Sequence, residues 1–218
     1  MNLRVIVLVV AAVVVPRVGA GQIREGAPTV TFDNDTAGQP PAAFSFGRTG
    51  GGAAGGWVVL AEKDAPSAPN VLAQVDTDAT DDRFPVAVVN APAMKDGKVS
   101  VRCKPVSGSV DQACGVVVRY QDPDNYYLAR ANALEDNIRL YYVKDGRRRQ
   151  LASVGGKVAR GTWHQLALEA TGDRLQVSFD GKTVLDATDR TFPGPGKAGV
   201  WTKADSVTYF DDLTVTPR

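Results

Sequence analysis

Three arginines are spaced so that they could share one surface. Arg119, Arg130 and Arg139 lie in successive stretches of alternating residues, 114–121, 126–132 and 137–143. Side chains alternate between the two faces of a strand, and an unpaired charge avoids the core, so the three guanidinium groups are expected to share the outward face of one sheet. The expected binding residues on this face are Arg119, Tyr126, Arg130, Asn132, Asn137, Arg139 and Tyr141, joined by Trp201 and Lys203 from a neighbouring strand.

This mixture of side chains suits a carbohydrate. Aromatic rings bind the C–H faces of sugars, and planar polar groups fix the hydroxyls. Three arginines without a matching cluster of carboxylates favour an anionic or uronic-acid glycan. The alternative is an ordinary outward sheet face with cross-strand pairs.

Glu135 and Asp136 are the candidate catalytic residues. They lie in the turn between the second and third stretches, beside the expected face, where a carboxyl group could act as a general acid or base. The alternative is a solvated turn. His164, the single histidine, is expected to be partly buried and hydrogen-bonded, because it alternates in step with Leu166 and Leu168. It has neither a nucleophile context nor zinc-ligand spacing.

Calcium is the only ion that the sequence suggests. Asp33 and Asp35 follow the first predicted strand, and Asp211 and Asp212 belong to the last, so pairing of the terminal strands would bring together the oxygen ligands that Ca²⁺ prefers. The alternative is that these aspartates cap turns. The sequence predicts no required cofactor.

The first twenty residues have the layout of a secretory signal peptide cleaved after Ala20. Met1–Arg4 is basic, 5–15 is apolar and small residues precede the cut. The alternative is a membrane anchor, although eleven apolar residues are fewer than the roughly 20 that span a bilayer. The mature protein is therefore expected to be secreted or periplasmic and free of the membrane. With 25 Lys and Arg against 24 Asp and Glu, no nucleic-acid partner is expected.

Two cysteines in an exported chain favour a disulfide. Cys103 and Cys114 share the spacing of neighbouring inward valines, on adjacent strands across a short loop. The alternative is two buried thiols.

Many short strands separated by turn signals, without an amphipathic helix, predict an all-β fold: a two-sheet antiparallel jelly-roll sandwich. The single domain is expected to span 29–218, with an N-terminal strand and a Gly/Pro-rich loop in 21–56 and the jelly roll in 57–218. Beyond the three stretches above, the predicted strands are 29–32, 57–62, 70–75, 84–90, 98–104, 148–154, 163–170, 174–179, 183–187, 199–203 and 207–215. The arginines at 147–149 are predicted to be a solvated hairpin turn.

Several motifs resemble the concanavalin A-like lectin/glucanase superfamily, and most of all its bacterial exported laminin-G-like and 3-keto-disaccharide hydrolase groups. They are the Trp163-His164 pair before a strand, the hairpin at 179–182, the strand around Trp201 and the terminal segment 210–213. The resemblance covers roughly 70–215 and implies the jelly-roll fold, often with a structural calcium near the termini.

The resemblance implies less about activity. The glucanase branch carries Glu-x-Asp-x-Glu on one strand, and this chain lacks that motif. The hydrolase group has Asn-Ser-Gly and Gly-Tyr-Glu strands, which are replaced here by 115–119 and 127–130. We therefore expect a non-catalytic exported module that binds glycans or surfaces through a concave Arg/Tyr/Asn face. The alternatives are a glycoside hydrolase and a structural protein without a small ligand.

Overall fold

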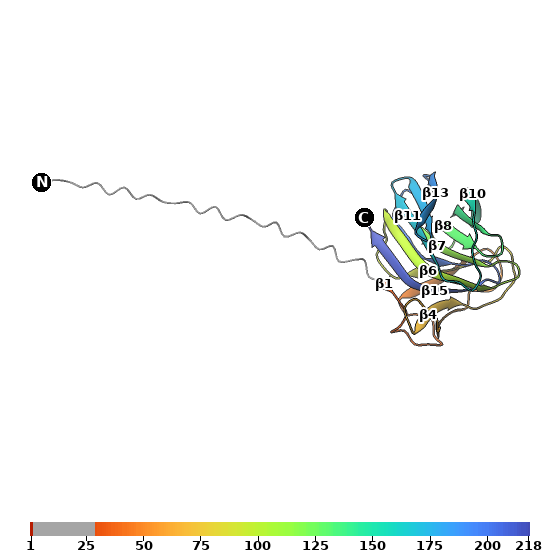
Figure 1. Cartoon of the computed structure of the whole chain (residues 1–218). Coiled ribbons are helices and arrows are strands. Elements are labelled where there is room, and N and C mark those ends of the chain that lie inside the picture. The colour runs from red at the N-terminus through yellow and green to blue at the C-terminus, as the bar shows by residue number, and fades with distance from the viewer. Residues whose placement is uncertain (2–28) are drawn as a thin grey trace.

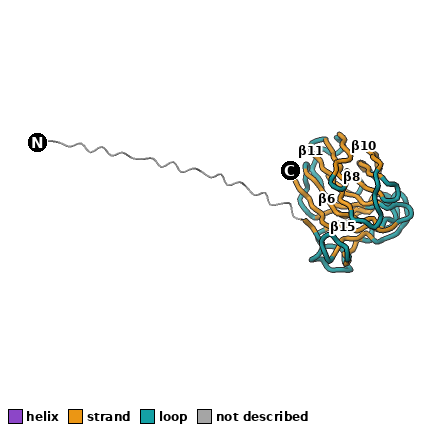
Figure 2. The backbone as a smooth tube through the Cα atoms, viewed as in Figure 1, coloured by secondary structure: helices purple, strands orange, loops and turns teal. Residues whose placement is uncertain are grey.

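The computed structural model describes Met1 and residues 29–218. The strands of 29–218 form two antiparallel sheets (Figures 1 and 2). The predicted signal peptide, apart from Met1, and the lead-in to residue 28 lie outside the described residues. Valine-rich runs with alternating burial form the strands, and turns containing Gly, Asp and Asn join them. Among the described residues, no helix could cross a membrane by its length and apolarity.

Sheet A has the strand order β13-β12-β11-β6-β15-β4-β3, and β1 also pairs with β15. Its strands are β1 (Thr29–Val30), β3 (Trp57–Ala61), β4 (Asn70–Gln74), β6 (Gly97–Ser107), β11 (His164–Thr171), β12 (Arg174–Phe179), β13 (Lys182–Thr188) and β15 (Val207–Pro217).

Sheet B has the order β10-β9-β8-β7-β14-β5-β2. Its strands are β2 (Phe44–Thr49), β5 (Phe84–Val89), β7 (Ala113–Asp122), β8 (Asn125–Asn132), β9 (Asn137–Lys144), β10 (Arg147–Gly155) and β14 (Lys197–Trp201). All neighbours pair antiparallel, so the predicted two-sheet sandwich is confirmed.

Strand β2 was missed by the sequence analysis, which assigned its residues to a flexible Gly/Pro-rich loop. Phe44 is buried, with its ring centroid 5.6 Å from that of Phe32, and β2 pairs with β5 along its whole length. The flanking glycines and prolines hid a short alternating strand that tertiary pairing stabilises.

The core lies between the sheets. Val116, Val118, Ile138 and Leu140, which the two-residue period places on the face opposite the predicted arginine face, belong to it. The inward positions on β6 and β11 complete the other side, with Val99, Val101, Leu166 and Leu168 all fully buried. Alternation therefore predicted these inward positions correctly.

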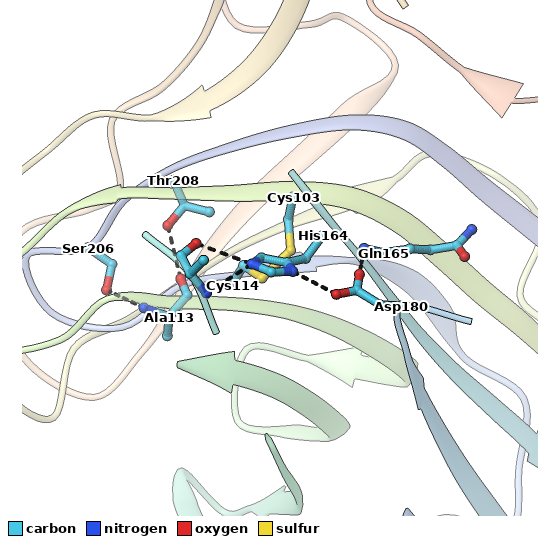
Figure 3. The surroundings of a disulfide bond; sticks show 9 residues. Cys103, Ala113, Cys114, His164, Gln165, Asp180, Ser206 and Thr208 are labelled. Atoms are coloured by element: carbon cyan, nitrogen blue, oxygen red, sulfur yellow. Dashed lines mark hydrogen bonds and ion pairs between the residues drawn. A yellow bond between two sulfur atoms is a disulfide. The ribbon is translucent and has the colours of Figure 1, made fainter. Parts of the chain in front are cut away.

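A disulfide between Cys103 and Cys114 joins β6 of sheet A to β7 of sheet B, as predicted (Figure 3). Beside it, the imidazole of His164 stacks on Phe179 with ring centroids 4.9 Å apart, and His164 Nδ1 lies 2.8 Å from a carboxylate oxygen of Asp180. The single histidine thus has the expected buried, hydrogen-bonded surroundings.

Candidate functional site

The outer face of sheet B is largely covered, which corrects the expectation of an open surface. It carries a second apolar cluster, formed by Phe84, Val86, Val88, Ala113, Val117, Tyr120, Tyr126, Leu128, Tyr141, Val143 and Trp201. Trp201 Nε1 donates to the hydroxyl of Tyr126 at 3.2 Å, and that hydroxyl lies 2.8 Å from Thr49 Oγ1. Thr49 also donates to the carbonyl of Pro123, so the β7–β8 turn closes over this end of the face.

Arg119 does not lie on this face, which corrects its predicted role. Its backbone is left-handed (φ 49°), and the regular pairing of β7 with β8 is interrupted between Val118 and Asp122. The irregularity changes the alternation. Tyr120, which an uninterrupted two-residue period would point inward, therefore stacks on Tyr126 in the outer cluster with ring centroids 5.7 Å apart.

The Arg119 guanidinium instead holds three loops together. It donates to the carbonyls of Lys95 at 2.8 Å, Phe192 at 2.9 Å and Gly172 at 2.6 Å, and to a carboxylate oxygen of Asp96 at 3.1 Å. With its nitrogens already engaged, this arginine has a structural role.

Arg130 and Arg139 do share the outer face, as a cross-strand pair, with Glu135 between them. The Glu135 oxygen Oε2 accepts from Arg130 at 2.9 Å and from Asn137 at 2.9 Å, and it lies 3.2 Å from Arg139 Nη1. Partial burial acts to raise the pKa of Glu135, but the hydrogen bonds from Asn137 and Arg130 outweigh it and lower the pKa to about 2. Glu135 is therefore a fixed anion.

Asp136, the other catalytic candidate, points away from the arginines. Its carboxylate accepts from the backbone N–H of Val158 at 3.1 Å and from Lys157 at 3.0 Å. These bonds hold the pKa of Asp136 below its usual value. Of the two predicted carboxylates, only Glu135 belongs to the site.

Asn132 and Lys203 are held by protein contacts. Asn132 accepts from the backbone N–H of Leu134 and Glu135 and donates to Asp111 at 2.7 Å, so it positions the turn that carries Glu135. Lys203 pairs with Asp81 and, at 3.1 Å, with the buried Asp111. Both were predicted to bind ligand, but each supports the site from beneath or beside it.

Arg148 is a site residue that the sequence analysis missed. Its guanidinium carbon lies 4.7 Å from the ring centroid of Tyr141, 4.8 Å from that of Phe84 and 6.0 Å from that of Trp201. Burial lowers the pKa of Arg148. Strand pairing could have indicated this role, because in the β9–β10 hairpin Arg148 pairs with Val143, a member of the outer cluster. The run of three arginines suggested a solvated turn instead.

We call Arg130, Arg139 and Arg148, with Glu135 between the first two, the guanidinium cluster. Four buried nitrogens in it lack a hydrogen-bond partner within residues 29–218: Nε and Nη1 of Arg130, Nε of Arg139 and Nη1 of Arg148. The Oδ1 atom of the adjacent Asn137 is likewise unpartnered. Arg130 is only 1% exposed, whereas the side chains of Arg139 and Glu135 are 31% and 39% exposed, so the cluster opens to solvent on one side.

The predicted calcium residues are placed around Ser67 and Asn70. Asp211 accepts from Ser67 N at 2.8 Å and Asp212 from Ser67 Oγ at 2.6 Å, while Asp33 accepts from Asn70 N at 3.1 Å. The backbone carbonyl of Asp35, and not its carboxylate, accepts a hydrogen bond from the side-chain amide of Asn70. Within the described part of the chain, no group of three or more His, Cys, Asp or Glu side chains is arranged to hold a metal ion. The structure therefore gives the calcium prediction no support beyond the pairing of β1 with β15.

No family model matches the chain. Over 95 residues, 43% of this chain, it is 28% identical to a levanase from Bacillus subtilis, and the match spans only 14% of that longer protein. Among solved structures, the carbohydrate binding module CBM66 from Bacillus subtilis is similar with a TM-score of 0.63 and 20% identity, covering 78% of this chain and 94% of that one.

A β-glucanase from Bacillus licheniformis is similar with a TM-score of 0.57 and 13% identity, covering 89% of this chain and 99% of that one. Two packed antiparallel sheets and these neighbours decide the fold. It is the concanavalin A-like jelly roll. The fold that the sequence resemblance implied is thus confirmed, whereas the likeness to laminin-G-like proteins and 3-keto-disaccharide hydrolases stays a prediction.

Proposed function

We propose that this protein is a carbohydrate-binding module whose ligand binds over the guanidinium cluster. The unpartnered N–H groups of Arg130, Arg139 and Arg148 carry the proposal, because buried polar groups are normally hydrogen-bonded and unmade bonds are costly. A sugar offers several oxygens within a small volume. The names of the similar proteins, a carbohydrate binding module and a levanase, support the same class of ligand.

The ligand of this proposal carries an acidic group, as in a uronic-acid glycan. The guanidinium groups of Arg130 and Arg139 already share one carboxylate, that of Glu135, and its low pKa keeps it ionised. Arg148 has no ion pair within residues 29–218. A ligand carboxylate would supply the missing acceptor, and charge-assisted bonds of this kind are the stronger ones.

Export to an oxidising compartment is part of the proposal. The Cys103–Cys114 disulfide supports it, since disulfides persist mainly in secreted and periplasmic proteins. The predicted signal peptide in residues 1–20 would direct the chain there.

A glycan array on residues 21–218, followed by calorimetry, tests the proposal. Acidic glycans should be retained in preference to neutral ones. Arg139→Ala should weaken binding about tenfold or more, because it removes a partly exposed guanidinium that can bond to the ligand. Arg149→Ala is the matched control, since Arg149 is exposed and lies next to Arg148 on β10. Retention of no glycan, or equal loss in both variants, would reject the site. Preferential retention of neutral fructan would reject the acidic ligand alone.

A glycoside hydrolase is the second candidate, favoured by one observation. Glu135 faces the cluster as a permanent carboxylate, while burial raises the pKa of the nearby Asp111, and two carboxyl groups with opposite shifts are typical of acid/base pairs. Release of shortened sugars from the retained glycan, abolished by Glu135→Gln, would show hydrolysis. Intact glycan after prolonged incubation would leave binding as the activity.

A further inference from the structure

An aromatic platform lies beneath Arg148. The Trp201 ring stacks on Phe84 with centroids 5.4 Å apart, and the centroid of a third ring, Tyr141, lies 4.7 Å from the Arg148 guanidinium carbon. Gly115 makes room for Trp201, because a Cβ atom there would lie 3.0 Å from Trp201 Cε3. The three rings are almost completely buried, although they stand on the outer face of sheet B.

Arg148, a charged side chain from an edge strand, lies over these rings. Arg148 belongs to β10, which ends sheet B, and its neighbours Arg147 and Arg149 are exposed. Its guanidinium contacts rings but has no carboxylate partner within residues 29–218, and its Nη1 makes no hydrogen bond there. Burial of a guanidinium N–H that makes no hydrogen bond is costly, and this cost offsets part of the attraction between the guanidinium and the rings.

The chemistry of the covered platform suits a sugar ring. Flat indole and phenyl rings are the surfaces on which the C–H faces of sugars pack. Arg130 and Arg139, with their own unpartnered nitrogens, lie beside the platform on the neighbouring strands, and Arg130 lies near the Tyr141 ring. A ring placed on the platform would therefore have its polar substituents next to guanidinium donors.

We propose that Arg148 is a displaceable cover on an aromatic subsite formed by Phe84, Tyr141 and Trp201. This inference rests on the proposed carbohydrate-binding function. The C–H face of a sugar ring takes the place of the guanidinium over the rings, and Arg148, moved to the rim, donates to the acidic group of the same sugar. Arg148 thereby makes the site selective: a neutral ring must displace the cover without compensation, whereas an acidic ring gains an ion pair.

The first test of the cover needs no ligand. Trp201 indole signals are recorded by NMR with a soluble gadolinium chelate, in the intact protein and in Arg148→Ala and Arg149→Ala, and are assigned with Trp201→Phe. The relaxation enhancement at Trp201 should rise at least twofold in Arg148→Ala and stay unchanged in Arg149→Ala. An unchanged Trp201 signal in a folded Arg148→Ala variant would overturn the inference.

The second test uses trigalacturonate and its methyl ester, which have the same sugar rings but differ in the charge of their carboxyl groups. Arg148→Ala should bind the ester at least threefold more tightly than the unaltered protein does and trigalacturonate at least threefold more weakly, while Arg148→Lys should restore part of the preference for the acid. Equal changes for both sugars would show that Arg148 does not select charge. If neither sugar bound, yet Trp201 became accessible in the first test, the proposed function would fail for this glycan and the cover would stand.

Discussion

The partners of each arginine on sheet B decide what that arginine can do. Arg119 is satisfied by three carbonyls and Asp96, whereas Arg130, Arg139 and Arg148 retain unpartnered nitrogens. Residue type and burial alone do not separate these groups, because both Arg119 and Arg130 are only 1% exposed. The number of engaged nitrogens assigns Arg119 to the scaffold and the other three to the site.

Replacing Arg119 by Ala should therefore lower stability and spare binding. The change leaves buried carbonyls without donors, and we expect the free energy of unfolding to fall by about 3 kcal/mol. Urea denaturation measures this loss, with Arg149→Ala as a control that should change stability by less than about 0.5 kcal/mol. A folded Arg119→Ala protein that lost glycan affinity would contradict the structural role.

Asp211 makes stability depend on pH. Burial raises its pKa to about 6, assisted by the charges of Asp212 and Asp33 and opposed by hydrogen bonds from two backbone N–H groups. Since the folded pKa exceeds the ordinary value of 3.8, the stabilisation is complete below about pH 4 and is lost as the pH rises through about 6. As the pH rises from 4 to 7, the thermal unfolding midpoint of Asp211→Asn should therefore rise relative to that of the unaltered protein.

Thermal unfolding of the two proteins at several pH values measures this difference. A constant difference would show that Asp211 does not titrate in this range. Millimolar calcium at pH 7 provides a second comparison: a bound ion would raise the midpoint of the unaltered protein more than that of Asp211→Asn.

At the scale of strands, close approach between β14 and β5 fixes the middle of sheet B. A Cβ atom on Gly199 would lie 2.0 Å from the carbonyl oxygen of Ala87, which belongs to the backbone of the neighbouring strand and cannot move independently. β14 also carries Trp201, so the position of the aromatic platform depends on this contact.

We expect Gly199→Ala to destabilise the protein by about 3 kcal/mol, because the strands must separate to admit the methyl group. Gly194→Ala is the control, since a Cβ there would have no atom within 4 Å. Urea midpoints of both variants provide the measurement. Similar midpoints would show that sheet B accommodates the extra carbon without opening.

Alternation along the strands could be predicted from the sequence, but its interruption could not. Val116, Val118 and Leu140 followed the two-residue period into the core, and Arg130 and Arg139 followed it outward. The left-handed conformation of Arg119 depends on carbonyls from three distant loops, and no local signal announces it. The covering of the outer face by Pro123 and Thr49 is likewise a contact between segments far apart in sequence.

At the scale of the whole molecule, the disulfide is the covalent link between the sheets. Cys103 and Cys114 are separated by 11 positions, and loop closure of this length contributes about 2–3 kcal/mol. Two hydrogen bonds beside the disulfide also join the sheets, because the side chains of Ser206 and Thr208, on the sheet A side, bond to the backbone of Ala113 in β7 (Figure 3).

Reduction should therefore lower the free energy of unfolding by about 2–3 kcal/mol without preventing folding, because the hydrogen bonds to Ala113 remain. Urea denaturation with and without dithiothreitol measures the loss. The Cys103→Ala/Cys114→Ala double variant should be insensitive to the reductant. Equal stability of the oxidised and reduced proteins would mean that the bond constrains the unfolded chain very little.

The pairing of β1 with β15 also determines how the domain can be tethered. Thr29 pairs with Thr214, and the chain ends four residues later at Arg218, so the entry and exit of the described domain lie together on sheet A (Figure 1). The guanidinium cluster occupies the outer side of the other sheet. A graft to a support, or to a second copy in tandem, through either end would leave the guanidinium cluster pointing outward and unobstructed.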